Sequence, residues 1–493
     1  MANRGSTRSM GAAHGGNDEK KEKGHHPAIH STDRRDDLVV HHQQTLWVYW
    51  TLIILGAWLL CSSFTFEYNA VAEVKRTVWI SVEARGAAMR WSDLVSGLLL
   101  MIFGCRSLIP DRPISLWICC AIGIWLSIAP LIFWAPSSMI YVNDTLVGAL
   151  VIGLSILIPG MPNMMMVMKM GDEVPYGWTY NPSSWPQRWI MIILGFLGWM
   201  VSRYLAAYQL GYSSDIWDPF FGNGSVNVLN SEMSRSLPIS DAGLGSLAYT
   251  FEFLMGFMGG PSRWRTMPWM VAFFGILVIP LGLVHIFLVI SQPLVVGAWC
   301  TFCIVAAVIM LPMIPLEADE VVAMGQHLLQ ATRRGEKFWS VFWKGGRPGG
   351  HSKDIRSPEL MNLSRAPKDV IQASVWGMSA PWNLVLSTIF GVALMTLPSL
   401  FQLPVQSTEA DICHLLGALI VVVSVLSMGE VLRIFRYLNA VLGLVIAIAP
   451  FFLTYHLNAF GVCNLLLGAI VVALCFRRGA KHEQYGLWDK YVL

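Results

Sequence analysis

The sequence contains little charge for its length. Only 13% of its 493 residues are Asp, Glu, Lys or Arg, whereas 55% are hydrophobic. A soluble domain carries roughly a quarter charged residues, so this composition excludes an ordinary soluble globule. The formal net charge of +3 is too small to indicate nucleic-acid binding. The apolar excess indicates a protein whose surface faces a lipid bilayer.

The sequence also lacks a complete zinc-binding set. Seven of its nine cysteines lie singly or side by side in apolar segments, where free cysteine behaves as a small hydrophobe. These are Cys61, Cys105, Cys119, Cys120, Cys413, Cys463 and Cys475. No second CxxC and no nearby histidine cluster accompanies Cys300 and Cys303, so we expect no metal.

Apolar residues are scarce in residues 1–44, which we interpret as a disordered cytoplasmic tail. A signal peptide would place its apolar core directly after a short basic region, whereas here the first apolar run begins at Leu46. We expect the histidines of this region to be solvated; they are His25, His26, His30, His41 and His42.

Runs of about 20 apolar residues are abundant, and each is long enough to cross a bilayer as a helix. Twelve occur, near 46–66, 92–109, 115–136, 143–165, 189–210, 243–260, 268–290, 296–315, 381–401, 410–428, 434–455 and 459–476. The sequence therefore predicts an all-α polytopic membrane protein with about twelve transmembrane helices.

Lys and Arg concentrate in two of the segments between these runs. Residues 316–379 and the stretch after 476 are basic, whereas the loops 137–142, 291–295, 402–409 and 456–458 contain no Lys or Arg. The positive-inside rule then places both termini in the cytoplasm. The loop 67–91, with Lys75, Arg76, Arg85 and Arg90, is an exception that could form a short amphipathic surface helix.

An internal repeat relates the two ends of the membrane region. At an offset of 320 residues Gly97 falls on Gly417, Gly123 on Gly443, and Gly148 on Gly468; at a different offset Gly56 falls on Gly391. Small residues at shared positions suit close packing of membrane helices. The sequence thus predicts two parallel four-helix units around a central four-helix bundle. Ser379-Ala380-Pro381-Trp382, which opens a hydrophobic helix, resembles the SPW-repeat membrane proteins.

Cys300 and Cys303 differ from the other cysteines because they lie three positions apart, as a CxxC, at the start of an apolar segment. On a helix this spacing places both thiols on one face, near enough to form a disulfide. A helix N-terminus also stabilises a thiolate, the form that attacks disulfides. The pair therefore indicates thiol–disulfide chemistry.

The region 188–320 resembles the bacterial branch of the vitamin K epoxide reductase family. The likeness rests on Arg203-Tyr204-Leu205-Ala206, Val228-Leu229-Asn230-Ser231, Pro238-Ile239, Gly243-Leu244-Gly245, Tyr249 and Trp299-Cys300-Thr301-Phe302-Cys303. The resemblance implies a four-helix enzyme of a bacterial inner membrane that passes electrons from protein thiols to a quinone of the ubiquinone or menaquinone type. It also implies that Cys303 meets the quinone, and that Cys300 exchanges with thiols of an outer partner such as a thioredoxin-like protein.

The chain departs from that family pattern in the loop 211–243, which has no cysteine, although family members usually carry a shuttle pair there. Ser225 stands where the second loop cysteine would be expected, and Trp217 lies near the first. Either an external redox partner reaches Cys300 directly, or the relay is lost. Cys413 and Cys463, which lie toward the outer ends of their helices, could replace the missing loop cysteines as an electron relay.

Polar residues inside membrane segments are expensive and therefore indicate function or specific pairing. We expect an ion pair between Arg203 and Glu252. Ser231, Tyr249 and His285, together with Asp241, are candidates for lining a quinone head-group site. Asp93, Asp144 and His414 are expected to snorkel or to cap helices near the outer face.

Three functions follow from these features: a quinone-linked thiol–disulfide oxidoreductase, a non-catalytic membrane scaffold or complex subunit, and a transporter. The last is disfavoured because the repeats flank the central unit instead of meeting across a site. The predicted divisions are a tail (1–44), an SPW-like unit (45–168), a vitamin K epoxide reductase-like unit (188–320), a basic cytoplasmic linker (321–378), a second SPW-like unit (379–478) and a cytoplasmic tail (479–493).

Overall fold

A computed structural model describes residues 39–40, 42–70, 74, 78–110, 112–157, 173–346, 352–358, 366–404, 407–452 and 458–492. His25, His26, His30, His41, Lys75 and Arg76 lie outside this described part. The protein is 72% helical. The sheet found among the described residues has two short antiparallel strands, β1 (Glu173–Val174) and β2 (Ser352–Lys353). The all-α prediction is confirmed.

Each of the twelve predicted segments forms helix. Ten helical stretches are long and apolar enough to span a membrane. They comprise α2 (Leu46–Thr65), α3 (Val82–Ser107), α4 (Pro113–Ile132), α5 (Ser138–Ile152) with η1 (Gly153–Leu157), α7 (Trp185–Gln209), α11 (Pro268–Val278) with α12 (Pro280–Val295), α13 (Thr301–Arg333), α16 (Trp382–Leu400), α17 (Thr408–Leu426), and η2 (Glu430–Tyr437) with α18 (Leu438–Phe452). The other two segments form α9 (Asp241–Phe257) and α19 (Ala459–Cys475), of 17 residues each.

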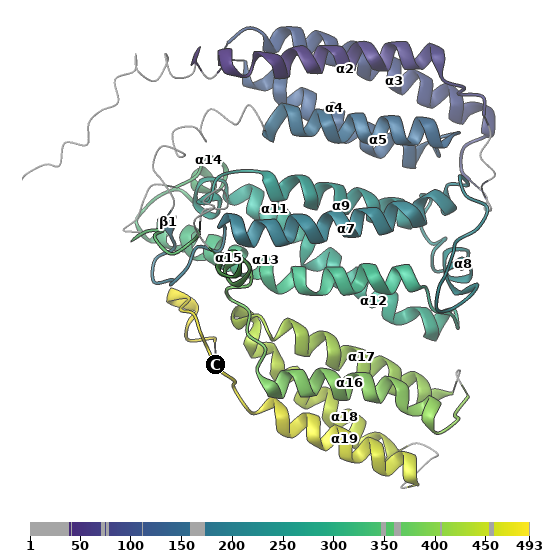
Figure 1. Ribbon diagram of the computed structural model, residues 1–493, viewed down its shortest axis with the longest axis vertical. Coiled ribbons are helices and arrows are strands. Elements are labelled where there is room, and N and C mark those ends of the chain that lie inside the picture. Colours follow the sequence, from purple (N-terminus) through teal and green to yellow (C-terminus); the bar gives the residue numbers. More distant parts are fainter. Residues whose placement is uncertain are drawn as a thin grey trace, which may run out of the picture.

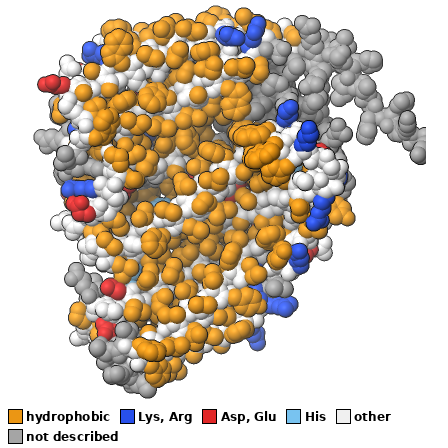
Figure 2. All heavy atoms as spheres, turned by 180° about the vertical axis from the view of Figure 1, so that it is seen from behind, with side chains coloured by type: hydrophobic (Ala, Val, Ile, Leu, Met, Phe, Trp, Pro, Cys, Tyr) orange, Lys and Arg blue, Asp and Glu red, His pale blue; other side chains and the backbone are white. Residues whose placement is uncertain are grey.

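The helices form three stacked groups (Figure 1): α2–α5, then α7, α9 and α11–α13, then α16–α19. Hydrophobic side chains cover most of the face shown in Figure 2, and the charged ones visible there lie mainly along its two edges. On α2, for example, Trp50, Ile54 and Trp58 are more than half exposed. Apolar side chains gain nothing from facing water, so this exposed belt identifies a membrane protein.

Glycines at repeat-equivalent positions mark where helices cross within each flanking group. A Cβ on Gly97 would lie 2.7 Å from the carbonyl oxygen of Gly56, and one on Gly417 would lie 2.6 Å from that of Gly391. Gly123 meets Gly148 in the same way, and Gly443 meets Gly468. These four crossings pair α2 with α3, α16 with α17, α4 with α5 and α18 with α19. The repeat seen in the sequence is therefore a repeated backbone contact.

Substituting Gly97 with alanine is expected to destabilise the protein by about 1–3 kcal/mol, because the added methyl group forces two helix backbones apart. Gly325 on α13 is the matched control, since a Cβ there meets nothing within 4 Å. Gly325→Ala should be neutral or stabilising by up to about 1 kcal/mol through helix propensity. Thermal unfolding in detergent measures both variants. Equal unfolding midpoints would show that the crossing tolerates a methyl group.

Two sequence expectations need correction. Residues 82–90 do not form a surface helix, because they are the first turns of the long helix α3. The segment predicted to end at 315 continues as α13 to Arg333, which is 33 residues or about 50 Å of helix. A bilayer core needs only about 30 Å. The extra length of α13 therefore projects beyond the other helices and organises one end of the central group.

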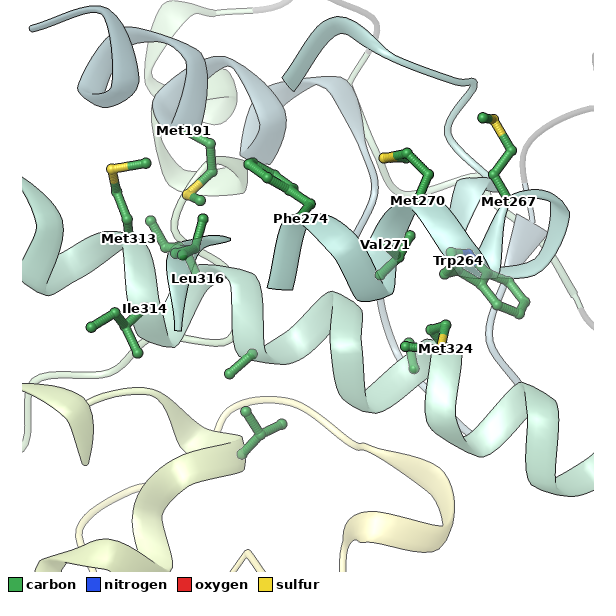
Figure 3. Packing of buried hydrophobic residues seen from close by; sticks show 14 of the residues in the cluster. Met191, Trp264, Met267, Met270, Val271, Phe274, Met313, Ile314, Leu316 and Met324 are labelled. Carbon is green, nitrogen blue, oxygen red and sulfur yellow. The ribbon is translucent and has the colours of Figure 1, made fainter. Parts of the chain in front are cut away.

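This projecting end carries its own core. Helices α10 (Arg263–Thr266) and α14 (Phe338–Lys344) pack on α13, and α15 (Pro367–Ala373) packs on α7. Figure 3 shows Met191, Phe274, Met313 and Leu316 gathered between α7, α11 and α13, and these residues belong to the largest buried cluster of the described residues. We call this the Arg263 end of the central group, and the opposite end the Cys300 end.

The segment after α19 returns to the Arg263 end (Figure 1), where η3 (Gly486–Trp488) lies. Tyr485 is fully buried there and forms an isolated β-bridge with Trp178. Its hydroxyl donates to Glu430 at 3.0 Å, and its carbonyl accepts from the Gln326 side chain at 2.9 Å. The tail thus joins the last flanking unit to the central group.

Candidate redox site

Cys300 and Cys303 are joined by a disulfide at the start of α13, with their Cα atoms 5.2 Å apart. Cys300 is the N-cap of the helix, and its sulfur accepts the backbone N–H of Cys303 at 3.1 Å. Gly297, with φ +70°, lets the chain turn sharply between α12 and α13. The turn at Gly297 therefore allows Cys300 and Cys303 to lie at the N-terminus of α13.

Two polar side chains hold the segment around the disulfide. The buried Gln292 of α12 accepts the backbone N–H of Cys300 at 3.2 Å. Asp218, in the loop after α7, accepts from the hydroxyl of Thr301, which lies between the two cysteines. Sequence reasoning missed both residues, since a lone Gln in a helix and an Asp in a polar loop carry no motif.

Asp218 also binds the short helix α8 (Gly224–Leu229). Its second oxygen accepts from the Ser225 hydroxyl at 2.6 Å and the Ser225 amide at 3.2 Å, while the first accepts from the amides of Phe221 and Phe220. Burial alone would raise the pKa of Asp218, but the hydrogen bonds from Ser225, Thr301 and these amides outweigh it and hold the pKa well below its ordinary value. We call this arrangement the Asp218 clasp.

The Asp218 clasp holds α8 in a position where it covers the disulfide. A Cβ on Gly224 would lie 2.1 Å from the carbonyl oxygen of Trp299, so the helix begins in direct contact with the redox motif. Val228 and Leu229 share a buried cluster with both cysteines. Cys300 is consequently fully buried, and Cys303 is 9% exposed. Ser225, at the expected position of the second loop cysteine, is part of this cover, whereas Trp217 is 71% exposed.

Replacing Asp218 with alanine is expected to release α8 and to speed alkylation of Cys300 in the reduced protein by about 10-fold or more, since hydrogen bonds to a charged group contribute about 1.5–3 kcal/mol. The lowered pKa means that the clasp is formed at neutral pH and is lost only when strong acid protonates Asp218. Peptide mass spectrometry follows the rate at Cys300. Asp215→Asn, at an exposed position in the same loop, is the control. An unchanged rate would show that α8 is held by other contacts.

Tyr249 and His285 lie together on the Arg263 side of the disulfide. The Tyr249 hydroxyl donates to the carbonyl of Ala306 at 3.1 Å, and its ring meets the His285 ring edge-on with centroids 6.4 Å apart. Ala306 is one turn along α13 from Cys303. The structure therefore brings these two predicted residues together, one turn or more from the disulfide.

Ser231 is separate from this pair. It lies after α8, where its hydroxyl donates to the carbonyl of Val228 at 2.7 Å and its oxygen accepts the amide of Ser234 at 3.3 Å. Asp241 likewise joins Gln209 and Ser234 at the start of α9. Both take part in the polar network of the loop, and a role for Ser231 beside Tyr249 and His285 stays a prediction.

The predicted ion pair between Arg203 and Glu252 is also wrong. Arg203 donates to the Thr145 hydroxyl at 3.0 Å and lies over the rings of Tyr141 and Trp199. A buried oxygen of Glu252 has no partner. Helices α7 and α9 run antiparallel with Ser202 beside Gly245, which puts Glu252 about two turns from Arg203 along the bundle, or roughly 10 Å.

The C-terminal group contacts the redox motif through His414. Its ring meets the Trp299 ring edge-on with centroids 4.9 Å apart, and its Nε2 lies 2.9 Å from the carbonyl oxygen of Ile290. His414 is buried between helices, so the snorkelling or capping expected for it is wrong. Cys413 is buried too, and its thiol donates to Asn464 at 3.5 Å.

Among the residues that the structure describes, no three His, Cys, Asp or Glu side chains are grouped to hold a metal ion.

Comparison with protein families assigns the three helix groups. Residues 189–318 match the Vitamin K epoxide reductase family, and residues 46–158 and 373–477 match the SPW repeat domain. Both resemblances seen in the sequence are confirmed. No curated protein and no solved structure matches the chain.

Proposed function

We propose that the central unit, which matches the Vitamin K epoxide reductase family, is a thiol–disulfide oxidoreductase that passes electrons from protein thiols to a quinone. The observation that carries this proposal is the Cys300–Cys303 disulfide at the N-terminus of α13, covered by α8. A helix N-terminus stabilises the thiolate released when such a disulfide is opened.

The reaction balances as two exchanges followed by reoxidation. A substrate thiolate attacks the sulfur of Cys300, which forms a mixed disulfide and releases Cys303 as a thiolate. A second substrate thiol displaces Cys300, so that the substrate leaves as a disulfide and both cysteines are reduced. A bound quinone, ubiquinone or menaquinone in type, accepts the two electrons and two protons of the dithiol, and the Cys300–Cys303 bond reforms.

Tyr249 and His285 fit a quinone head group in this scheme. They place a hydroxyl and an imidazole inside the bundle, next to the turn that follows Cys303. Hydrogen bonds from such groups stabilise the charge that develops on a carbonyl oxygen. His285 is half-buried, and its imidazole can donate one N–H hydrogen bond at that position.

The buried position of Cys300 requires that α8 move before a protein thiol can attack. We propose that a thioredoxin-like partner docks on the loop 211–240 and opens the clasp. The same scheme places the Cys300 end outside and both termini in the cytoplasm of a bacterial inner membrane, in keeping with the basic segments that follow α13 and α19.

A dithiol–quinone assay tests the proposal. Purified protein supplied with a dithiol and a short-chain quinone should catalyse quinone reduction, and the Cys300–Cys303 pair should cycle between reduced and oxidised forms as each substrate is added. Extraction should also release a co-purified quinone. A pair that keeps one redox state whatever is added would instead support the alternative function, a non-catalytic membrane scaffold or complex subunit, which the missing loop cysteines favour.

A further inference from the structure

Two aspartates meet in the interior of the N-terminal SPW unit. Asp93 of α3 and Asp144 of α5 are both 0% exposed, and their carboxyl groups lie within hydrogen-bonding reach of each other. The expectation that they snorkel or cap helix ends is therefore wrong. Burying one carboxylate in a membrane protein is costly, and burying two side by side is more so.

Each aspartate has one oxygen that is satisfied and one that is not. The Tyr68 hydroxyl donates to Oδ2 of Asp93, and the Asn143 side chain donates to Oδ1 of Asp144 at 3.1 Å. Oδ1 of Asp93 and Oδ2 of Asp144 are buried and have no donor. Between the described residues, no ion pair links either aspartate to a Lys or Arg.

The equivalent positions in the C-terminal SPW unit show that the aspartate pair lacks a hydrogen-bond donor. At the offset of 320 residues Asp93 falls on Cys413 and Asp144 on Asn464. In the C-terminal unit these two buried side chains form a complete hydrogen bond, in which the Cys413 thiol donates to the amide oxygen of Asn464. The same place in the N-terminal unit holds two carboxyl groups, each with one buried oxygen that no donor reaches. It lacks one donor hydrogen.

We propose that Asp93 and Asp144 bind one proton between them, which makes the N-terminal SPW unit a proton-binding site and leaves the C-terminal unit, with its neutral pair, without one. A single shared proton supplies the missing donor and halves the buried charge. Two unpartnered oxygens and one tyrosine are too few to coordinate a metal cation, which takes about six oxygen ligands.

The surroundings favour retention of that proton. Burial, then the charges of Asp93 and Asp144, raise the pKa of Tyr68, so its hydroxyl remains a donor. Tyr212 of the central unit lies near Asp144, and its ring packs on that of Tyr141 of α5 with centroids 5.8 Å apart. Three cations near these residues are engaged elsewhere: Arg90 lies over the Tyr68 ring, Arg85 donates to the carbonyl of Ile80, and Arg203 donates to the Thr145 hydroxyl.

A small polar cavity lies beside the site, at the boundary with the central unit. It has a volume of about 10 Å³, close to the space needed for one water molecule. Its lining includes Tyr141 and Thr145, which flank Asp144 on α5, and Arg203 and Ser246 of the central unit. The cavity therefore lies where the two units meet, and neither aspartate is part of its lining.

The swap variant Asp93→Cys/Asp144→Asn, which copies the pair found at Cys413 and Asn464, provides a matched control. The shared proton is bound more tightly when the protein is folded than when it is unfolded, so it stabilises the fold at acidic pH and this stabilisation is lost as the pH rises. Between about pH 5 and about pH 9 the unfolding midpoint of the wild type should fall by at least about 3 °C more than that of the swap variant.

Infrared difference spectroscopy detects the proton directly, through the C=O stretch of a protonated carboxyl group, and does not depend on an unfolding midpoint. The wild type should show a protonated-carboxyl C=O band that disappears as the pH rises, and Asp144→Asn should remove it. Absence of that band in the wild type, or equal pH dependence of the wild type and the swap variant, would overturn the proposal. So would a stability at high pH that requires sodium and is lost in choline, because it would identify a cation site.

Discussion

Replacing Cys303 with alanine is expected to reduce dithiol-driven quinone reduction at least about 10³-fold, because the variant cannot re-form the disulfide that transfers two electrons. Cys300→Ala should lose turnover to a similar degree for a different reason: it removes the sulfur that incoming thiols attack. Initial rates with a short-chain quinone measure both losses.

Cys413→Ala is the matched control for these variants. Cys413 is a buried thiol on α17, bonded to Asn464 and separate from the disulfide, so its removal should leave turnover within about twofold of the wild type. Cys303→Ala protein that still turned over at the wild-type rate would contradict the proposed mechanism. Equal inactivity of all variants and of the wild type would point to the scaffold function.

Loss of the Arg263 side chain should be the most destabilising single change at the other end of the central group. Arg263 binds Glu320 through two hydrogen bonds of 2.6 and 2.5 Å, and both residues are at most 2% exposed. Arg263 also donates to the carbonyl of Met255 at the end of α9. Arg263→Ala would leave the Glu320 carboxylate buried without its cation, at a cost of about 3–5 kcal/mol.

Two comparisons isolate the cause of that loss. Arg334→Ala breaks the exposed pair with Glu336, which should cost no more than about 1 kcal/mol. The double variant Arg263→Met/Glu320→Leu removes both charges and should regain much of the stability lost by Arg263→Ala. Thermal unfolding in detergent measures all three. A double variant as unstable as Arg263→Ala would show that shape, and not the unpaired charge, dominates.

The sequence predicted those features that depend on hydropathy or on local spacing. Twelve apolar runs became twelve helical segments, the shared glycines became helix crossings, and the CxxC spacing became a disulfide. Each is a local property of the chain or a repeat of one. Once the helices form, their length and the direction of their side chains determine that these glycines meet and that these cysteines lie close together.

What the sequence did not predict depends on residues far apart in the chain. The Asp218 clasp joins positions about 80 residues apart, and the Arg263–Glu320 pair joins positions 57 apart. The prediction of an Arg203–Glu252 ion pair was wrong for a related reason. Counting residues from the helix ends does not give the register between two helices. A polar side chain in a membrane helix indicates that a partner exists, but only packing identifies it.

The position of Tyr485 in the chain determines when the central unit can finish folding during synthesis. The Arg263 end of the central unit is completed by a residue made more than 150 residues after α13 begins, since Tyr485 fills the space between Trp178, Glu430 and Gln326. A ribosome must therefore finish and release all of the second SPW unit before the central unit can close. During that interval the nascent chain leaves the Trp178 surface uncovered, which makes it the place where an insertion factor or a quality-control protease would meet an unfinished molecule.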